Sequence, residues 1–228
     1  MALAEAVGSA AVDQAIAARE ALAAARQRTT PVVLARDRVL PVVDALGPLL
    51  PNGLRRGSVV AVEGGVGATS LAVTLAVATS AEGSWVAVVG VPWLGLEAIA
   101  ELGVAQERLL VIPEVPRESW AAVLAVLVDA VDVVLMAAPR ITSGEVRRLT
   151  ARAREREAVL VAMPRTSWPG AEVRLSVGRS WWRGPTGDGA GRLVARKAEV
   201  VCGGRGAAAR ERRTTLWLPG PDGRVMPA

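Results

Sequence analysis

Five short apolar runs, each separated from the next by a segment with helical spacing, constrain the fold of this chain most. Runs such as "VDVVLM" and "AVLVAM" are apolar at successive positions rather than at alternate ones. Strands of this kind are buried on both faces, as in a parallel sheet covered by helices. Because crossovers between parallel strands are right-handed, the pattern predicts a three-layer α/β domain. The predicted strands are Ser58–Glu63, Trp85–Gly90, Leu109–Ile112, Val131–Met136 and Val159–Met163, and the predicted helices are Thr69–Ala78, Leu96–Leu102, Ser119–Asp129 and Ser143–Glu155.

The two ends of the chain follow different patterns. After Pro164 the segments "AEVRLSVGR", "RLVARKAEVV" and "TTLWLPGPDGR" predict strands joined by turns, which we interpret as an antiparallel extension of the same sheet. Ser9–Arg28 has helical spacing, and its alanine-rich face suits packing on a neighbouring molecule or back on its own core. Between them, "LPVVDALGPLLPNGLRRG" predicts a short helix and a Pro/Gly turn. We therefore divide the chain into an N-terminal helix, 1–30, and a core domain, 31–228.

Composition excludes several classes of protein. The chain has no histidine and one cysteine, Cys202, which argues against a zinc site and against an internal disulfide. It has no apolar run long enough for a membrane span, and its start lacks the basic region of a signal peptide, so we expect a cytoplasmic protein. The net charge of +5 suits an acidic partner such as nucleic acid, or reflects a general bias toward alanine, arginine and valine.

The stretch "VAVEGGVGATSLAV" has the layout of a phosphate-binding loop: a strand, a glycine cluster and a helix. Functional loops follow G-x-x-x-x-G-K-[ST], but here the glycine spacing is shorter and Ala68 stands where the lysine belongs. The glycines either make a tight turn or keep a weak anion site at the start of the helix. The degenerate loop comprises Gly64, Gly65, Gly67, Ala68, Thr69 and Ser70. We expect no bound cofactor and no metal.

The order of these parts resembles the RecA core fold. "LPNGLRRGSVVAVEG" is similar to the RecA entry into the phosphate loop, and "VDVVLMAAP" to the Walker B strand. The resemblance implies that the carboxylate that polarises the attacking water falls on Val91, and the magnesium-binding aspartate on Ala137. With the lysine, the base and the metal ligand all replaced, we predict that the chain is not an ATPase. Only "PRTSWPGA" remains where RecA carries a long DNA-binding loop, which argues against strand exchange.

A RecA-like core without these groups resembles the ImuA-type proteins of inducible mutagenesis cassettes, particularly the actinobacterial variant. The similarity is carried by "GATSLA", "GSWVAVVG", "GLEAIAELGV" and the tail "GGRGAAARERRTTLWLPGPDGRV". It implies a non-catalytic adaptor of SOS-induced translesion DNA synthesis, with two partners: ImuB, an inactive Y-family polymerase homologue, and an error-prone C-family DNA polymerase. Contacts with RecA, contacts with single-stranded or primed DNA, and self-association stay open. The implied location is cytoplasmic, and nucleoid-associated after DNA damage.

Two other functions fit a degenerate RecA-like fold. A SulA-type cell-division inhibitor would bind the division tubulin, although the basic tail argues against it. The second alternative is a switch protein that binds ATP without hydrolysing it, although the missing lysine and aspartate argue against ATP binding.

Arginines and tryptophans gather in the last third of the chain with few acids. Such residues bind single-stranded nucleic acid by stacking and phosphate pairing, form hot spots of protein interfaces, or protect the edge strands of a sheet. The candidate contact residues for DNA or a partner are Arg179, Trp181, Trp182, Arg183, Arg196, Lys197, Arg205, Arg210, Arg212 and Arg213. A second basic segment, the predicted helix Ser143–Glu155, is interpreted as a solvated surface, with a DNA or partner patch as the alternative.

Overall fold

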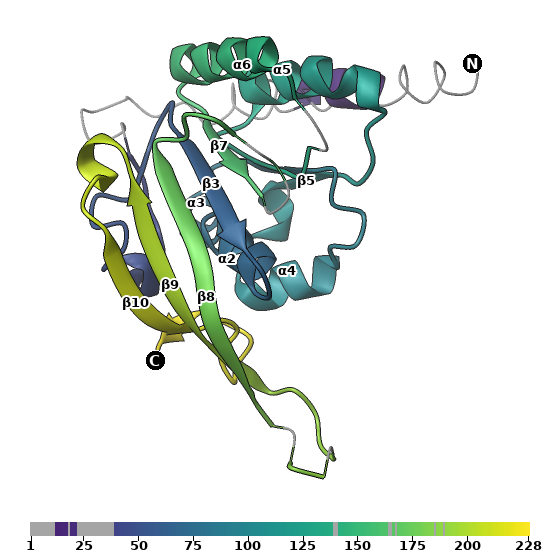
Figure 1. The fold of residues 1–228 in the computed structure, drawn as a ribbon. Coiled ribbons are helices and arrows are strands. Elements are labelled where there is room, and N and C mark those ends of the chain that lie inside the picture. Colours follow the sequence, from purple (N-terminus) through teal and green to yellow (C-terminus); the bar gives the residue numbers. More distant parts are fainter. Residues whose placement is uncertain are drawn as a thin grey trace.

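The computed structural model describes residues 12–17, 19–21, 39–138, 141–163, 166, 168–184, 186–188 and 190–228. A mixed sheet of nine strands forms the centre of this described part (Figure 1). Its strands are β3 (Val59–Gly64), β4 (Val86–Val89), β5 (Leu109–Ile112), β6 (Val133–Met136), β7 (Val159–Ala162), β8 (Val173–Arg183), β9 (Ala195–Gly204), β10 (Arg212–Trp217) and β11 (Met226–Pro227). Their spatial order is β11-β10-β9-β8-β3-β7-β6-β4-β5.

The strands from β5 to β8 in this order run parallel, whereas β9, β10 and β11 continue the sheet in antiparallel pairs. Helices α2 (Ala68–Thr74), α3 (Val77–Ala81) and α4 (Leu96–Leu102) cover one face of the parallel part, and α5 (Trp120–Ala130) and α6 (Ser143–Arg156) cover the other (Figure 1). The predicted RecA-like three-layer core with an antiparallel extension is therefore confirmed. Short 3₁₀ turns lie at Asp44–Leu46 (η2), Gln106–Arg108 (η3), Arg117–Ser119 (η4) and Gly206–Ala208 (η5).

The alternation of side chains along each parallel strand explains why the apolar runs are unbroken. On β3, Val60 and Val62 join the hydrophobic cluster on the α2 side, whereas Val59 and Ala61 join the cluster under α5 and α6. Successive side chains of a strand point to opposite faces, so a strand with helices on both sides needs apolar residues at every position.

The N-terminal helix packs on the chain's own core where it is described. Residues 12–17 and 19–21 are helical, Ala15 is fully buried in the cluster under α5 and α6, and Val12 packs against that cluster. This favours the second of the two alternatives, a helix folded back on its own domain. The rest of the predicted helix Ser9–Arg28 lies outside the described residues.

Several local expectations need correction. The cap of α6 is Thr142 rather than Ser143: the Thr142 hydroxyl accepts from the Glu145 backbone N–H, and the Glu145 carboxylate accepts from the Thr142 N–H at 2.8 Å. Ser119 makes no side-chain cap, because the 3₁₀ turn η4 leads into α5. The predicted helix Thr69–Ala78 is divided between α2 and α3. A small sheet of β1 (Val39–Leu40) and β2 (Leu54–Arg55) was not foreseen.

Asp129, at the end of α5, ties that helix to α6. Its carboxylate accepts from Arg152 Nε and Nη2 at 2.7 and 2.6 Å, and Arg156 Nε lies 3.2 Å away. The hydrogen bond with Arg152 holds the pKa of Asp129 below its ordinary value of 3.8, although burial opposes the shift.

We expect Asp129→Asn to lower the free energy of unfolding by about 1 kcal/mol at pH 7. A depressed pKa in the folded state means that the unfolded chain binds more protons, so this stabilisation is present above pH 3.8 and is lost as the pH falls below it. Urea unfolding across a pH series measures the difference between the two proteins. A difference that grows toward acid pH would contradict the assignment.

Candidate functional site in the degenerate phosphate loop

The glycine loop lies where β3 ends and α2 begins, at the carboxyl edge of the parallel strands. Gly64 and Gly67 have φ angles of 108° and 104°, which side chains of L residues rarely adopt. A Cβ at Gly64 would also lie 2.7 Å from the Val177 carbonyl oxygen on β8. By contrast, a Cβ at Gly65 would meet nothing within 4 Å. The tight-turn interpretation thus accounts for two of the three glycines.

The side chain of Arg196, from β9, packs into this loop. A Cβ at Gly67 would lie 2.9 Å from the guanidinium carbon, so the loop and the arginine are in close contact. Arg196 Nε donates to the Leu218 carbonyl at 2.7 Å, and Nη2 donates to the Ser70 hydroxyl at 3.2 Å. The Trp182 ring lies under the guanidinium, 5.0 Å from its carbon. The loop therefore contacts a cation supplied by the chain itself.

Burial makes this arginine different from the other candidate contact residues. Arg196 is 5% exposed, and desolvation lowers the pKa of its guanidinium. An arginine nevertheless stays charged in a protein, so the hydrogen bonds and the ring of Trp182 compensate for its removal from water. Arg196 is directed inward and is not part of an exposed basic surface.

The positions that the RecA resemblance assigns to ATPase chemistry are apolar and packed. Ala68 is fully buried and Val91 is 2% exposed, and both belong to the hydrophobic cluster on the α2 side, against which Ala137 also packs. Within the described residues, no group of three potential metal-binding side chains comes together. None of the described helices is long and apolar enough to cross a membrane.

Comparison with known proteins places these elements in a family. The sequence profile of the MT3502 N-terminal domain matches residues 48–170, more than half of the chain. The chain belongs to the MT3502 N-terminal domain family. The matched part contains the glycine loop and the strands from β3 to β7, whereas β8 to β11 lie beyond it. The uncharacterized protein Rv3395c of Mycobacterium tuberculosis (strain ATCC 25618 / H37Rv) is 36% identical over 112 residues, which is 48% of this chain and 54% of that protein. The match thus spans about half the length of the relative.

The structure separates the candidate contact residues of this MT3502-family chain into two groups. The first group lies where the end of β8 pairs with the start of β9, and it comprises Arg179, Trp181, Trp182, Arg183, Arg196 and Lys197. The second group lies between the other end of β9 and the start of β10, and it comprises Arg205, Arg210, Arg212 and Arg213. From residue 196 to residue 205 an extended strand spans about 30 Å, so the exposed members of the two groups form two separate surfaces, and the buried Arg196 belongs to neither.

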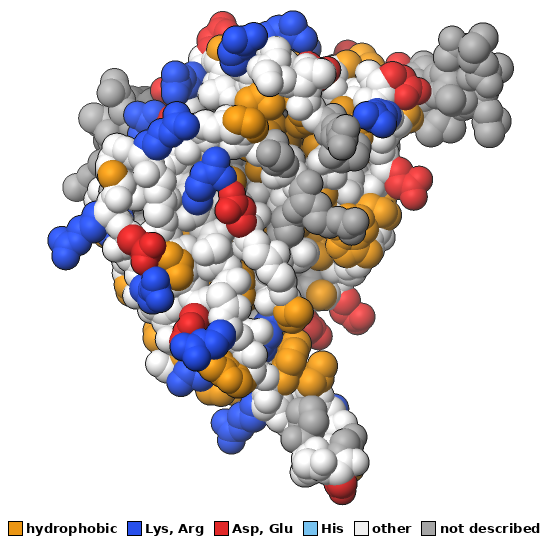
Figure 2. Space-filling view, in the orientation of Figure 1, with side chains coloured by type: hydrophobic (Ala, Val, Ile, Leu, Met, Phe, Trp, Pro, Cys, Tyr) orange, Lys and Arg blue, Asp and Glu red, His pale blue; other side chains and the backbone are white. Residues whose placement is uncertain are grey.

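The first surface is on a two-stranded arm, formed by the end of β8 and the start of β9, that projects beyond the rest of the sheet (Figure 1). Trp181 and Trp182 are 49% and 40% exposed and occupy successive positions, so they face opposite sides of the arm. The Arg179 guanidinium lies 6.0 Å from the Trp181 ring and 3.5 Å from Glu199. Figure 2 shows hydrophobic side chains next to charged ones at the base of this arm.

The exposure of several apolar residues was not predicted from the sequence. Leu193 and Val194 lie on the arm at 55% and 39% exposure, and Val66 in the glycine loop is 65% exposed. Trp93, after β4, is 59% exposed. Their exposure has no local sequence signal, because apolar residues in a core and on a surface look alike in a single sequence.

The arginines of α6 lie at the surface, and some of them also make ion pairs within the domain. Arg152 and Arg156 bind Asp129, and Arg154 lies 3.2 Å from Glu172, while all five arginines of the helix, Arg147 and Arg148 included, are exposed. Three of the five side chains thus make ion pairs within the domain while staying exposed to solvent, which supports the interpretation of a solvated surface.

Proposed function

We propose that the chain is a non-catalytic RecA-fold adaptor in an SOS-induced translesion DNA synthesis complex, where it bridges ImuB and an error-prone C-family polymerase. The packing of Arg196 against Gly67 is the observation that carries the non-catalytic part of this proposal. A phosphate loop needs open backbone N–H groups and a lysine that reaches the phosphates. Here the loop contacts an internal guanidinium, and the lysine position holds a buried alanine.

The arm supplies the surface through which such an adaptor would act. Trp181 exposes apolar area at the end of β8, with the Arg179 guanidinium 6.0 Å from its ring, and Leu193 and Val194 expose apolar area just before β9. Tryptophan and arginine dominate the binding energy of protein interfaces, and exposed apolar patches commonly mark interaction sites. The link to ImuB and to the polymerase rests on the resemblance to ImuA-type proteins.

Co-expression with affinity-tagged ImuB tests this proposal, with the division tubulin as the competing bait. We expect ImuB to retain the chain, and Trp181→Ala with Leu193→Ser to lower the affinity about tenfold or more, because both remove exposed apolar contacts. Trp93→Ala is the control, since Trp93 is also an exposed tryptophan, at 59% against 49% for Trp181, but lies outside the arm.

The outcomes separate the candidate functions. Retention by the tubulin and not by ImuB would favour the division inhibitor. A rise in melting temperature with Mg-ATP would favour the nucleotide switch, because a ligand that binds only the folded state stabilises it. Retention by ImuB that is insensitive to Trp181→Ala and Leu193→Ser would place the contact elsewhere.

A further inference from the structure

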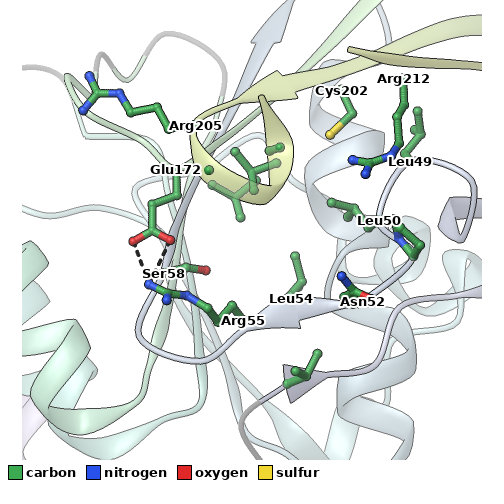
Figure 3. Close-up of a pocket in the computed structure, with 17 residues that line it drawn as sticks. Leu49, Leu50, Asn52, Leu54, Arg55, Ser58, Glu172, Cys202, Arg205 and Arg212 are labelled. Atoms are coloured by element: carbon green, nitrogen blue, oxygen red, sulfur yellow. Dashed lines mark hydrogen bonds and ion pairs between the residues drawn. The ribbon is translucent and has the colours of Figure 1, made fainter. Parts of the chain in front are cut away.

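A second site lies at the opposite edge of the sheet from the glycine loop. A cavity of about 300 Å³ opens between the turn before β2, the start of β8 and the end of β9 (Figure 3). Its walls include Leu50, Leu54, Val60 and Cys202, all at most 6% exposed. Because Val60 is near the start of β3, this cavity is on the amino edge of the parallel strands, whereas the glycine loop is on the carboxyl edge.

The rim of the cavity is basic. Three arginines line it, Arg55, Arg205 and Arg212, against one glutamate, Glu172. Glu172 is already paired, since it lies 3.0 Å from Arg55 and 3.2 Å from Arg154 (Figure 3). Arg205 is exposed, and no ion pair joins it to the described residues. Arg210 follows in the loop before β10 and is exposed, whereas Arg213 lies in β10 and pairs with Glu211 at 2.8 Å. With Arg205 and Arg210 added, the surroundings of the cavity keep an excess of positive charge.

The aliphatic walls and the cationic rim of the cavity together indicate which kind of ligand would fit it. The volume is at the lower end of the range for ligand pockets, which suits one apolar side chain with its flanking backbone rather than a large cofactor. Carboxylates on both sides of such a side chain would meet the arginines of the rim.

We propose that this cavity binds a short acidic peptide segment of a partner protein, with one leucine-sized side chain inserted as an anchor. Nucleic acid suits the cavity less well, because bases are held by stacking on aromatic rings and the described lining contains none. This inference is independent of the proposed function, since it uses neither the arm nor the glycine loop.

Fluorescence anisotropy with a short fluorescein-labelled peptide, a central leucine flanked by aspartates, tests the proposal on the full chain. We expect saturable binding that weakens with salt, and roughly a tenfold or greater loss when alanine replaces the leucine, because burial of the larger side chain supplies the affinity. Asn52→Trp, at the exposed rim, should block the cavity and abolish binding.

A matched pair of variants tests whether peptide binding depends on the positive charge at the rim of the cavity. We expect Arg205→Glu to weaken binding about fivefold at low salt, whereas Arg210→Glu, which makes the same charge change on an exposed residue outside the lining, should weaken it less. Modification of Cys202, the single cysteine, by a small thiosulfonate gives a second measurement, and the peptide should slow it. Equal losses for the two arginine variants, or tighter binding of labelled oligothymidylate than of the peptide, would overturn the proposal.

Discussion

Replacing Ala68 with lysine is expected to destabilise the protein and to leave Mg-ATP binding undetectable. Ala68 is fully buried at the first position of α2, so a lysine there would place an ammonium group in the hydrophobic cluster on the α2 side. The guanidinium of Arg196, in contact with Gly67, would repel it. Overpacking and the burial of an unpaired charge together should lower the free energy of unfolding by about 4 kcal/mol.

Urea unfolding followed by tryptophan fluorescence measures this effect, with Mg-ATP present and absent. Val66→Lys is the matched control, because Val66 is 65% exposed in the same loop and its replacement should change stability by no more than about 0.5 kcal/mol. A stable Ala68→Lys protein that unfolds at a higher urea concentration with Mg-ATP than without it would instead mean that the loop is a phosphate site lacking only its lysine.

Arg196→Ala is expected to lower the free energy of unfolding by about 3 kcal/mol. The change removes the donors to the Leu218 carbonyl and the Ser70 hydroxyl and leaves the Trp182 ring without its cation. Hydrogen bonds from a charged donor and a desolvated cation–π contact together account for this magnitude. Arg196→Met keeps most of the volume, so its smaller loss measures the packing contribution separately from the hydrogen bonds.

Lys197→Ala is the control for this prediction, because Lys197 is the next residue of β9 and faces the other side of the sheet. Urea unfolding curves of the three variants and of the unmodified chain give the free energies of unfolding that are compared. If Arg196→Ala is as stable as the unmodified chain, the guanidinium has no structural role and is available to a ligand of the loop.

The parallel core could be read from the sequence because the signal is local. Each apolar run is short, uninterrupted and followed by a helical pattern, and the predicted bounds of Leu96–Leu102 and Leu109–Ile112 agree with α4 and β5. The assignment of Ala68, Val91 and Ala137 to positions of the ATPase came from the resemblance to RecA and not from this pattern. Element ends were less predictable, since a neighbouring residue such as Thr142 can take the cap when its hydroxyl has the better geometry.

The layers of the fold and the antiparallel extension follow from local sequence patterns, because each strand and helix carries its own periodicity. The different environments of Arg196, buried against the glycine loop, and Arg205, exposed at the rim of a cavity nine residues on, follow instead from how the strands pack in three dimensions. Both are arginines in a basic, strand-forming stretch, and nothing local distinguishes them. The burial of Arg196 depends on contacts with residues 67, 70, 182 and 218, on other elements, which form only when β9 joins the sheet beside β8.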